Sequence, residues 1–196
     1  TLRLLAISGS SRTGSWNRKL VDAAARAAQA RAAQVESLDL RSLALPLYDA
    51  DLEKAAGVPE GARRLRDALR AADGVLLSAP EYNGFPTPLL LNSFDWLSRL
   101  QPEGDAPGGL AASSGKPLGL FSASPGPMGA LRSLNFTRQY LGMTIAMLPV
   151  PQQFALSKAG EAFDESGALK DGKQQAALEA VVVSLMRVAT ALKSAG

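Results

Sequence analysis

Short apolar runs alternate with longer segments of helical periodicity along the whole chain. Five runs have the length and composition of buried strands: residues 2–7, 35–40, 74–79, 117–124 and 143–148. Fully apolar runs of this length, ended by Gly-, Pro- or Ser-rich loops, are typical of parallel strands covered on both faces. Residues 153–156 could add a short piece at one edge of the sheet.

The segments between these runs have the composition of helices. The pattern predicts helices over residues 17–33, 63–72, 89–100 and 131–141. The last helix shows the clearest apolar face, made by Leu178, Val181, Val182, Leu185, Ala189 and Leu192. Strands that alternate with helices predict an α/β fold, a three-layer doubly wound parallel sheet of five strands. No repeat or linker interrupts the pattern, so residues 1–196 are expected to form a single domain.

Such sheets bind ligands beyond the carboxyl ends of their strands. Three distinctive loops follow strands at this edge, over residues 8–17, 80–88 and 122–129. We therefore expect one binding site built from all three loops.

Composition removes several classes of chemistry. The 196 residues are 46% hydrophobic and include neither Cys nor His. Disulfides, thiolate metal sites, Fe–S clusters and His-based triads are therefore excluded, and we expect no metal site. The net charge of +3 is scattered rather than gathered in a basic stripe, which disfavours nucleic-acid binding. With no apolar run of about 18 residues and no signal-like start, we expect a soluble cytoplasmic protein that does not bind membranes.

The first loop has the chemistry of a phosphate cradle. Small residues and hydroxyls stand between a buried strand and a helix start, where backbone N–H groups converge and the helix dipole favours an anion. Ser10, Ser11, Ser15 and Asn17 add donors, and Arg12 adds a positive charge. The loop is neither a Walker A sequence nor Gly-x-Gly-x-x-Gly. The alternative is an ordinary strand-to-helix turn with Ser15 as its N-cap.

The second loop predicts a rigid turn against which a planar ring could lie. Asn83-Gly84 is a tight-turn pair, and Thr87 between two prolines is a good N-cap for the next helix. The alternative is a purely structural turn. Trp96, in that helix, is expected in the core or at a subunit interface.

These residues together resemble one family. Three sets of residues carry the resemblance: Gly9-Ser10-Ser11-Arg12 with Ser15 and Asn17, then Pro80-Glu81-Tyr82-Asn83-Gly84, then Asn92 with Asp95-Trp96. They resemble the NADPH-dependent FMN reductases, which are flavodoxin-like quinone, chromate and azo-dye reductases. The resemblance implies strand order 2-1-3-4-5 and noncovalently bound FMN. It departs at Leu91, where the family usually has Lys, and in the third loop, Pro125 to Gly129 followed by Arg132.

The resemblance also implies which residues bind the cofactor. The FMN phosphate would lie on Ser10, Arg12, Ser15, Trp16 and Asn17. The isoalloxazine would lie against Pro80, Glu81, Tyr82, Asn83 and Gly84. The third loop would close the site through Ser122, Ser124, Pro125 and Gly126.

The implied activity is ping-pong hydride transfer from NADPH or NADH through FMN to a quinone, chromate, an azo compound or free flavin. The cofactor would carry this chemistry, so no catalytic side chain is assigned. Glu81 is a candidate by position alone, and its side chain could instead face solvent or pair with an Arg. An FMN-binding electron carrier or regulator is the main alternative. A phosphoryl-transfer enzyme is disfavoured, because the first loop lacks the Lys and the metal-binding acid that such chemistry needs.

An oligomer is also expected. Leu89, Leu90, Leu91, Phe94 and Trp96 make the helix after the second loop apolar nearly all round. Such a helix is covered on two sides, which predicts a homodimer through this region, or a homotetramer.

Overall fold

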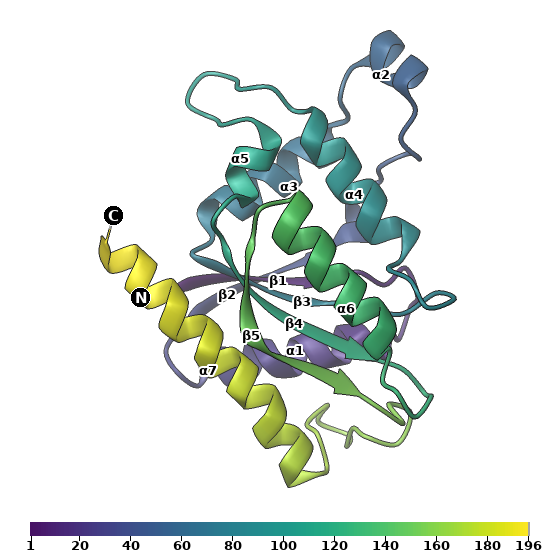
Figure 1. Cartoon of the computed structure of the whole chain (residues 1–196), viewed down its shortest axis with the longest axis vertical. Helices are drawn as coiled ribbons and strands as arrows, with labels where there is room; N and C mark the ends of the chain where they lie inside the picture. The colour runs from purple at the N-terminus through teal and green to yellow at the C-terminus, as the bar shows by residue number, and fades with distance from the viewer. Residues whose placement is uncertain (196) are drawn as a thin grey trace.

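The computed structural model describes residues 1–195, which form a five-stranded parallel sheet between two layers of helices (Figure 1). The strands are β1 (Arg3–Ser8), β2 (Gln34–Asp39), β3 (Gly74–Ser78), β4 (Pro117–Ala123) and β5 (Leu148–Leu156). Their order is β2-β1-β3-β4-β5, and every neighbouring pair is parallel. The predicted fold class and strand order are confirmed.

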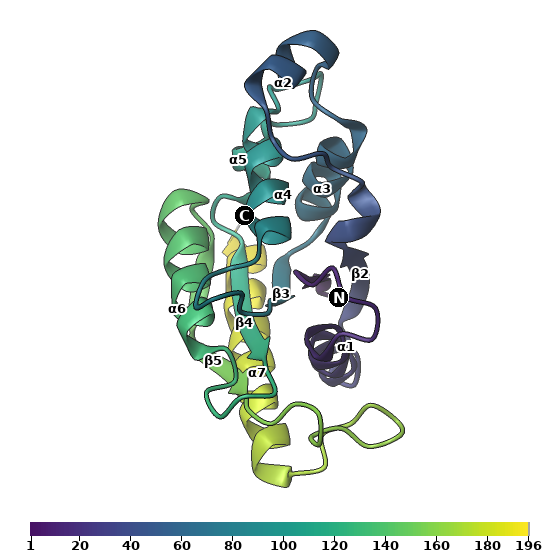
Figure 2. The same ribbon diagram turned by 90° about the vertical axis from the view of Figure 1, so that its right-hand side faces the viewer.

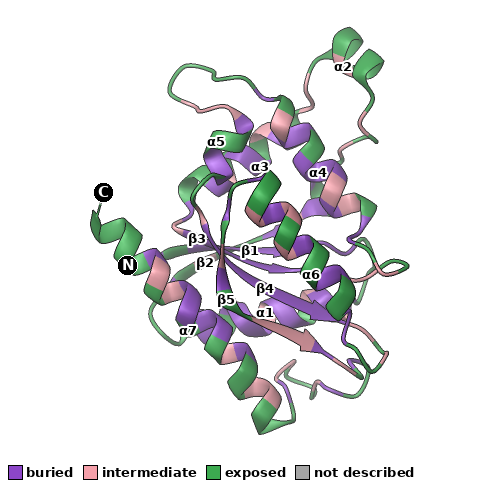
Figure 3. Cartoon of the chain, in the orientation of Figure 1, coloured by how far each residue is buried: buried purple, intermediate pink, exposed green. Residues whose placement is uncertain are grey.

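Alternate residues of each strand face opposite helical layers. Leu4 and Ala6 of β1 pack with α1 (Trp16–Gln29) and α7 (Gly172–Ala195). Leu5 and Ile7 pack on the other face, in the core shared with four other helices. These are α3 (Glu60–Ala71), α4 (Pro88–Arg99), α5 (Gly109–Ser113) and α6 (Leu131–Gln139). Apart from the exposed Arg3 at the start of β1, the inner strands β1, β3 and β4 are buried (Figure 3), as expected for a parallel sheet covered on both sides.

The fifth strand was predicted in the wrong place. Residues 140–144 form a π-helical turn, closed by an Ile145 N–H that donates to the Tyr140 carbonyl at 3.2 Å, and β5 starts only at Leu148. Buried Ile145 and Met147 imitate a strand pattern because they fill the core beneath this turn. The true strand carries two prolines, which an edge strand tolerates, and it includes the expected edge piece 153–156.

Two short helices and a 3₁₀ turn lie in segments predicted as loops. They are η1 (Leu40–Leu43), α2 (Ala50–Ala56) and α5. Helix α2 buries no residue and projects away from the sheet (Figure 2), so it has no hydrophobic periodicity to reveal it. The loop over residues 101–108 is fastened by Glu103, whose carboxylate pairs with Arg63 at 2.9 Å and Arg66 at 3.2 Å.

Helix α4 holds the segment that leads to α2. The Asn92 amide accepts the Tyr48 N–H at 2.7 Å and donates to the Pro46 carbonyl at 2.8 Å. The Trp96 indole N–H donates to the same carbonyl at 2.7 Å. Leu90, Phe94 and Trp96 are fully buried within the chain. Trp96 is therefore a core residue, and the apolar character of α4 is explained without a partner subunit.

Helix α7 covers β3, β4 and β5 with the predicted face, except that Leu192 is exposed. By length and composition alone this helix could cross a membrane. Its fully buried Leu178, Val181, Val182 and Leu185 instead identify it as a core helix of the sheet.

Candidate active site at the carboxyl edge of the sheet

Three loops meet beyond the carboxyl ends of β1, β3 and β4, and they line a half-open cavity of about 200 Å³. Ten of the predicted cofactor residues line it: Ser10, Arg12, Ser15, Trp16, Asn17, Pro80, Glu81, Tyr82, Ser124 and Pro125. Ala123 completes the wall. Asn83, Gly84, Ser122 and Gly126 do not line the cavity. Residues separated by more than 100 positions thus line one cavity because parallel strands end at the same edge of the sheet.

The wall formed by the β1–α1 loop contains the start of a helix and several hydrogen-bond donors. Ser15 is the N-cap of α1, and its hydroxyl accepts the Asn17 N–H at 3.1 Å. The first turn of this 14-residue helix carries no acidic side chain. Since the first N–H groups of a helix have no intrahelical acceptor, the helix start offers donors and a partial positive charge to the cavity. The structure confirms Ser15 as the N-cap of α1, and anion binding by the same turn stays a prediction.

Arg12 lines the cavity beside this helix start. Its guanidinium stacks over the Trp16 ring at 4.3 Å and donates to the Gly14 carbonyl at 3.3 Å. The Arg12 N–H donates to the Ser10 hydroxyl at 3.3 Å. These contacts hold the positive charge beside the helix start while leaving the guanidinium exposed. Guanidinium donors of this kind suit phosphate oxygens.

Asn17 has a different role from the rest of the loop. Its side-chain oxygen accepts the Ser78 hydroxyl and the Ala123 N–H, both at 2.9 Å, and its nitrogen donates to the Ala123 carbonyl at 2.9 Å. The side chain is buried. Asn17 therefore joins α1 to the ends of β3 and β4, and it shapes the cavity floor.

The second loop is a two-residue hairpin. Tyr82 and Phe85 exchange both backbone hydrogen bonds, at 3.0 and 3.1 Å, around Asn83 (φ 53°) and Gly84 (φ 83°). Two successive left-handed residues define the Asn-Gly turn predicted from the sequence. Thr87 caps α4 as predicted and donates its hydroxyl to the Gly9 carbonyl at 2.8 Å. The first and second loops are thereby bonded to each other.

Glu81 fastens the second loop to α6. Its carboxylate accepts the Arg132 guanidinium at 2.5 and 3.1 Å and the Ser133 N–H at 3.2 Å. The Ser133 hydroxyl donates to the Pro80 carbonyl at 3.2 Å. Of the alternatives left open for Glu81, the structure shows the ion pair with an Arg, so this carboxylate is a support for the loop.

The third loop is held from below. The buried Ser122 hydroxyl donates to the Gly129 carbonyl at 2.6 Å, so this side chain supports the loop from inside and does not face the cavity. Gly129 has φ 60°, and a Cβ there would lie 2.7 Å from backbone atoms of β5. The segment after β5 adds two bonds, from Ala159 N–H to Ser124 O at 3.0 Å and from Lys158 N–H to Gly126 O at 3.3 Å. No sequence motif predicted that this segment would contact the third loop.

An apolar hollow of about 290 Å³ lies between the hairpin, α4 and α6. Phe85 and Phe136 pack against each other in its wall, with ring centroids 4.9 Å apart. Burial, reinforced by Asp95, raises the pKa of Tyr140 to about 12, so its phenol stays neutral over the physiological range. The hollow is lined by Phe85, Pro86, Leu91, Phe136, Gln139, Tyr140, Met143 and Thr144. Leu91 thus contributes apolar surface where the family usually places a charge.

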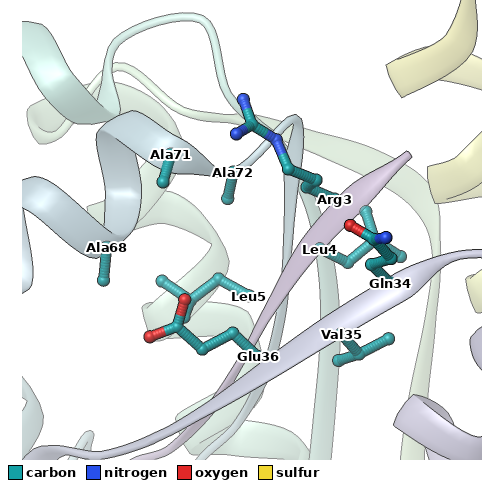
Figure 4. A pocket seen from close by; sticks show the side chains of 9 residues that line it. All are labelled: Arg3, Leu4, Leu5, Gln34, Val35, Glu36, Ala68, Ala71 and Ala72. Atoms are coloured by element: carbon teal, nitrogen blue, oxygen red, sulfur yellow. The ribbon is translucent and has the colours of Figure 1, made fainter. Parts of the chain in front are cut away.

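Another cavity, of about 270 Å³, lies at the opposite end of β1 and β2 beneath α3 (Figure 4). Arg3 and Glu36 are its charged residues, and alanines of α3 form one wall. It contains none of the predicted site residues and lies at the amino ends of the strands, away from the edge where doubly wound sheets bind ligands. Within residues 1–195, no cluster of acidic side chains is suited to a metal ion.

Comparisons with known proteins identify the family of this chain. A family model described as NADPH-dependent FMN reductase matches residues 2–161. An NAD(P)H-dependent FMN reductase of Pseudomonas aeruginosa is 36% identical over 174 residues, which cover 88% of this chain and 86% of the relative. A quinone reductase of Pseudomonas putida is 36% identical over 167 residues, 83% of this chain and 82% of the relative.

The solved structures show the same fold. FerB, a flavoenzyme NAD(P)H:(acceptor) oxidoreductase of Paracoccus denitrificans, superimposes with a TM-score of 0.75 at 27% identity, covering 95% of this chain and 98% of the other. The chain belongs to the NADPH-dependent FMN reductase family. It is an oxidoreductase with FMN as cofactor and NAD(P)H as electron donor.

Replacing Asn17 with Ala tests its structural role. The change leaves the Ser78 hydroxyl and both backbone groups of Ala123 without their partners, so we expect a loss of roughly 2–4 kcal/mol in the free energy of unfolding. Urea denaturation of flavin-stripped protein measures this without a contribution from the ligand.

The matched control is Asn135→Ala, since the Asn135 side chain accepts a single exposed hydrogen bond among residues 1–195, from Gln153 at 2.8 Å. That change should stay within about 0.5 kcal/mol of wild type. An Asn17→Ala protein as stable as the control would contradict the assignment.

Proposed function

We propose that this protein reduces planar organic acceptors, quinones above all, with FMN held in the cavity at the carboxyl edge of the sheet. The observation that carries the proposal is the convergence, in one cavity, of a helix N-terminus with Arg12 and the rigid turn after β3. FMN when bound would accept a hydride from NAD(P)H and deliver electrons to the acceptor. The chain's own residues supply binding and position.

The donor set suits this cofactor at both ends. The helix start, the hydroxyls of Ser10 and Ser15 and the Arg12 guanidinium would hold the phosphate. The turn over residues 80–84 would hold the ring. Glu81 keeps this turn in place through its bonds to Arg132 and Ser133. Ser124 and Pro125 would close the far side. Trp16 and Asn17 would shape the phosphate end, and Asn83 and Gly84 would offer backbone groups from the hairpin tip. Ser122 and Gly126 would act only through the third loop.

The apolar hollow supports the choice of acceptor. It adjoins the hairpin proposed to carry the ring, and Phe85, Phe136 and Met143 give it a surface suited to a flat apolar molecule. A doubly charged oxyanion such as chromate would lose hydration there without a paired cation. One of the curated relatives is a quinone reductase.

We also propose that residues 1–196 form a single cytoplasmic domain and that the protein is a homodimer. Exposed apolar side chains gather around the hollow, among them Phe136 and Met143, the latter 77% exposed. This surface lies on α6 and the π-helical turn, beside rather than on α4, where the sequence pattern placed the contact. A second subunit would bury these side chains and form the outer wall of the hollow.

The activity has a direct test. The purified protein should be yellow, its flavin absorption should bleach anaerobically with NADPH, and a benzoquinone should restore the colour. Turnover with the quinone should exceed that with chromate by about tenfold or more in kcat/KM, because the hollow is apolar. A colourless protein that FMN does not reconstitute would contradict the proposal. Bleaching only through a partner protein would identify an electron carrier instead.

Arg12→Ala tests the phosphate site. Loss of a charged hydrogen bond should weaken FMN binding by about 1.5–3 kcal/mol, on the order of 10- to 100-fold in Kd. Riboflavin, which lacks the phosphate, should bind the variant as it binds the wild type. Fluorescence titration with both flavins measures the difference, and equal weakening for both would remove Arg12 from the phosphate site.

Analytical ultracentrifugation at micromolar concentration tests the dimer. The wild type should sediment as a dimer, and Phe136→Glu should give a monomer because a charge would be buried in the interface. Val183→Glu is the control, since Val183 is similarly exposed on α7, away from the hollow. A monomeric wild-type protein would refute the proposal.

A further inference from the structure

Residues 11–14 form the outer rim of the loop proposed to bind phosphate, and few contacts hold this rim in place. Residues 11–14 are exposed, and Gly14 adopts a left-handed conformation (φ 68°). Over residues 1–195, two side chains from outside the loop bond to this rim. The Tyr82 hydroxyl lies 3.5 Å from the Ser11 hydroxyl, and Arg41 reaches the rim from the opposite side. The shape of the rim therefore depends on remote residues.

Arg41 bonds to the rim on both sides of Arg12. Its Nη1 donates to the Ser11 carbonyl at 3.2 Å and to the Thr13 hydroxyl at 3.4 Å. One nitrogen thus joins the residues immediately before and after the guanidinium proposed to bind phosphate. Freedom of the backbone at Arg12 is reduced without any contact to the Arg12 side chain.

Arg41 is itself anchored to the sheet. It lies in η1, directly after β2, and its N–H donates to the Asp39 carboxylate at 3.0 Å. The other Asp39 oxygen pairs with Arg18 of α1 at 2.7 Å and lies 3.7 Å from the Arg41 guanidinium. Asp39 is in register with Ser8, the last residue of β1. The rim is thereby connected to β2 and α1 through one carboxylate.

Arg41 could affect phosphate binding through its charge or through its hydrogen bonds to the rim, and the structure favours the hydrogen bonds. Its side chain is 53% exposed, and Asp39 offsets its charge. Exposed charges are screened by solvent and salt, whereas two hydrogen bonds to a short loop act locally. A loop already in its bound shape binds more tightly because less ordering is needed on binding.

We infer that Arg41 is a positioning residue that holds the 11–14 rim in its phosphate-binding shape and so favours phosphorylated over unphosphorylated flavin. The inference rests on the proposed function, which places the FMN phosphate in this loop. Neither the loop pattern nor the family resemblance pointed to Arg41, since it follows a different strand.

The test titrates the full-length flavin-stripped chain with FMN and with riboflavin and compares the ratio of the two Kd values. Arg41→Ala should weaken FMN binding about tenfold, as expected for lost hydrogen bonds, and leave riboflavin binding within about twofold. Arg64→Ala is the matched control, because Arg64 donates to the Ser42 carbonyl of the same 3₁₀ turn at 3.2 Å without touching the rim. The control should keep the wild-type ratio.

A merely structural role would weaken both flavins together and lower the thermal unfolding midpoint, leaving the ratio unchanged. That result would overturn the inference. Arg41→Lys keeps the charge but cannot reproduce the guanidinium geometry. It should therefore restore only part of the wild-type preference for FMN over riboflavin. Full recovery with Lys would show that charge alone suffices and would also overturn it.

Arg12→Ala separates this inference from the proposed function. If neither Arg12→Ala nor Arg41→Ala changes the ratio, the phosphate does not bind in this loop and the proposed site fails. If Arg12→Ala changes the ratio and Arg41→Ala does not, the site stands and only the role of Arg41 is refuted.

Discussion

The buried amide of Asn17 is the interaction on which the site most depends. It joins the first turn of α1 to the ends of β3 and β4 through three hydrogen bonds of 2.9 Å. A parallel sheet brings strand ends to one edge but does not by itself fix the loops that follow. The amide does so because it satisfies both backbone groups of Ala123, which would otherwise be buried without partners. The helix start and the third loop are therefore held at a constant separation.

The remaining loop contacts follow the same principle of support from a neighbouring element. Thr87 bonds the second loop to Gly9, Glu81 bonds it to α6, and Ala159 bonds the third loop from beyond β5. The backbone that faces the cavity is thus held by side chains and segments behind it. This arrangement suits an enzyme whose cofactor performs the chemistry, because the protein's contribution is then position and electrostatics. It also explains how a chain without His or Cys can be an oxidoreductase.

The apolar surface beside the site relates two proposals to each other. The π-helical turn places Met143 and Thr144 at the margin of the hollow formed by Phe85 and Phe136. Irregular helical turns of this kind are frequent at functional sites. A hollow that is apolar and open on one side favours a flat organic acceptor, and it also favours a second subunit as its cover. The proposed acceptor and the proposed dimer therefore draw on the same stretch of α6.

The sequence by itself determined the features that depend on neighbouring residues. Local preferences made three features predictable: the alternation of strands with helices, the Ser15 and Thr87 caps, and the left-handed Asn83-Gly84 turn. The strand order came from the family resemblance and was confirmed. Tertiary structure alone decided that Asn17 bonds to β3 and β4, that Glu81 pairs with Arg132 and that Arg41 reaches the rim. It also decided where β5 begins, because core packing of Ile145 and Met147 produced a strand-like pattern in a helical turn. Contacts between residues 28 to 106 positions apart leave no periodic trace in the sequence, since each depends on where the fold brings two distant residues.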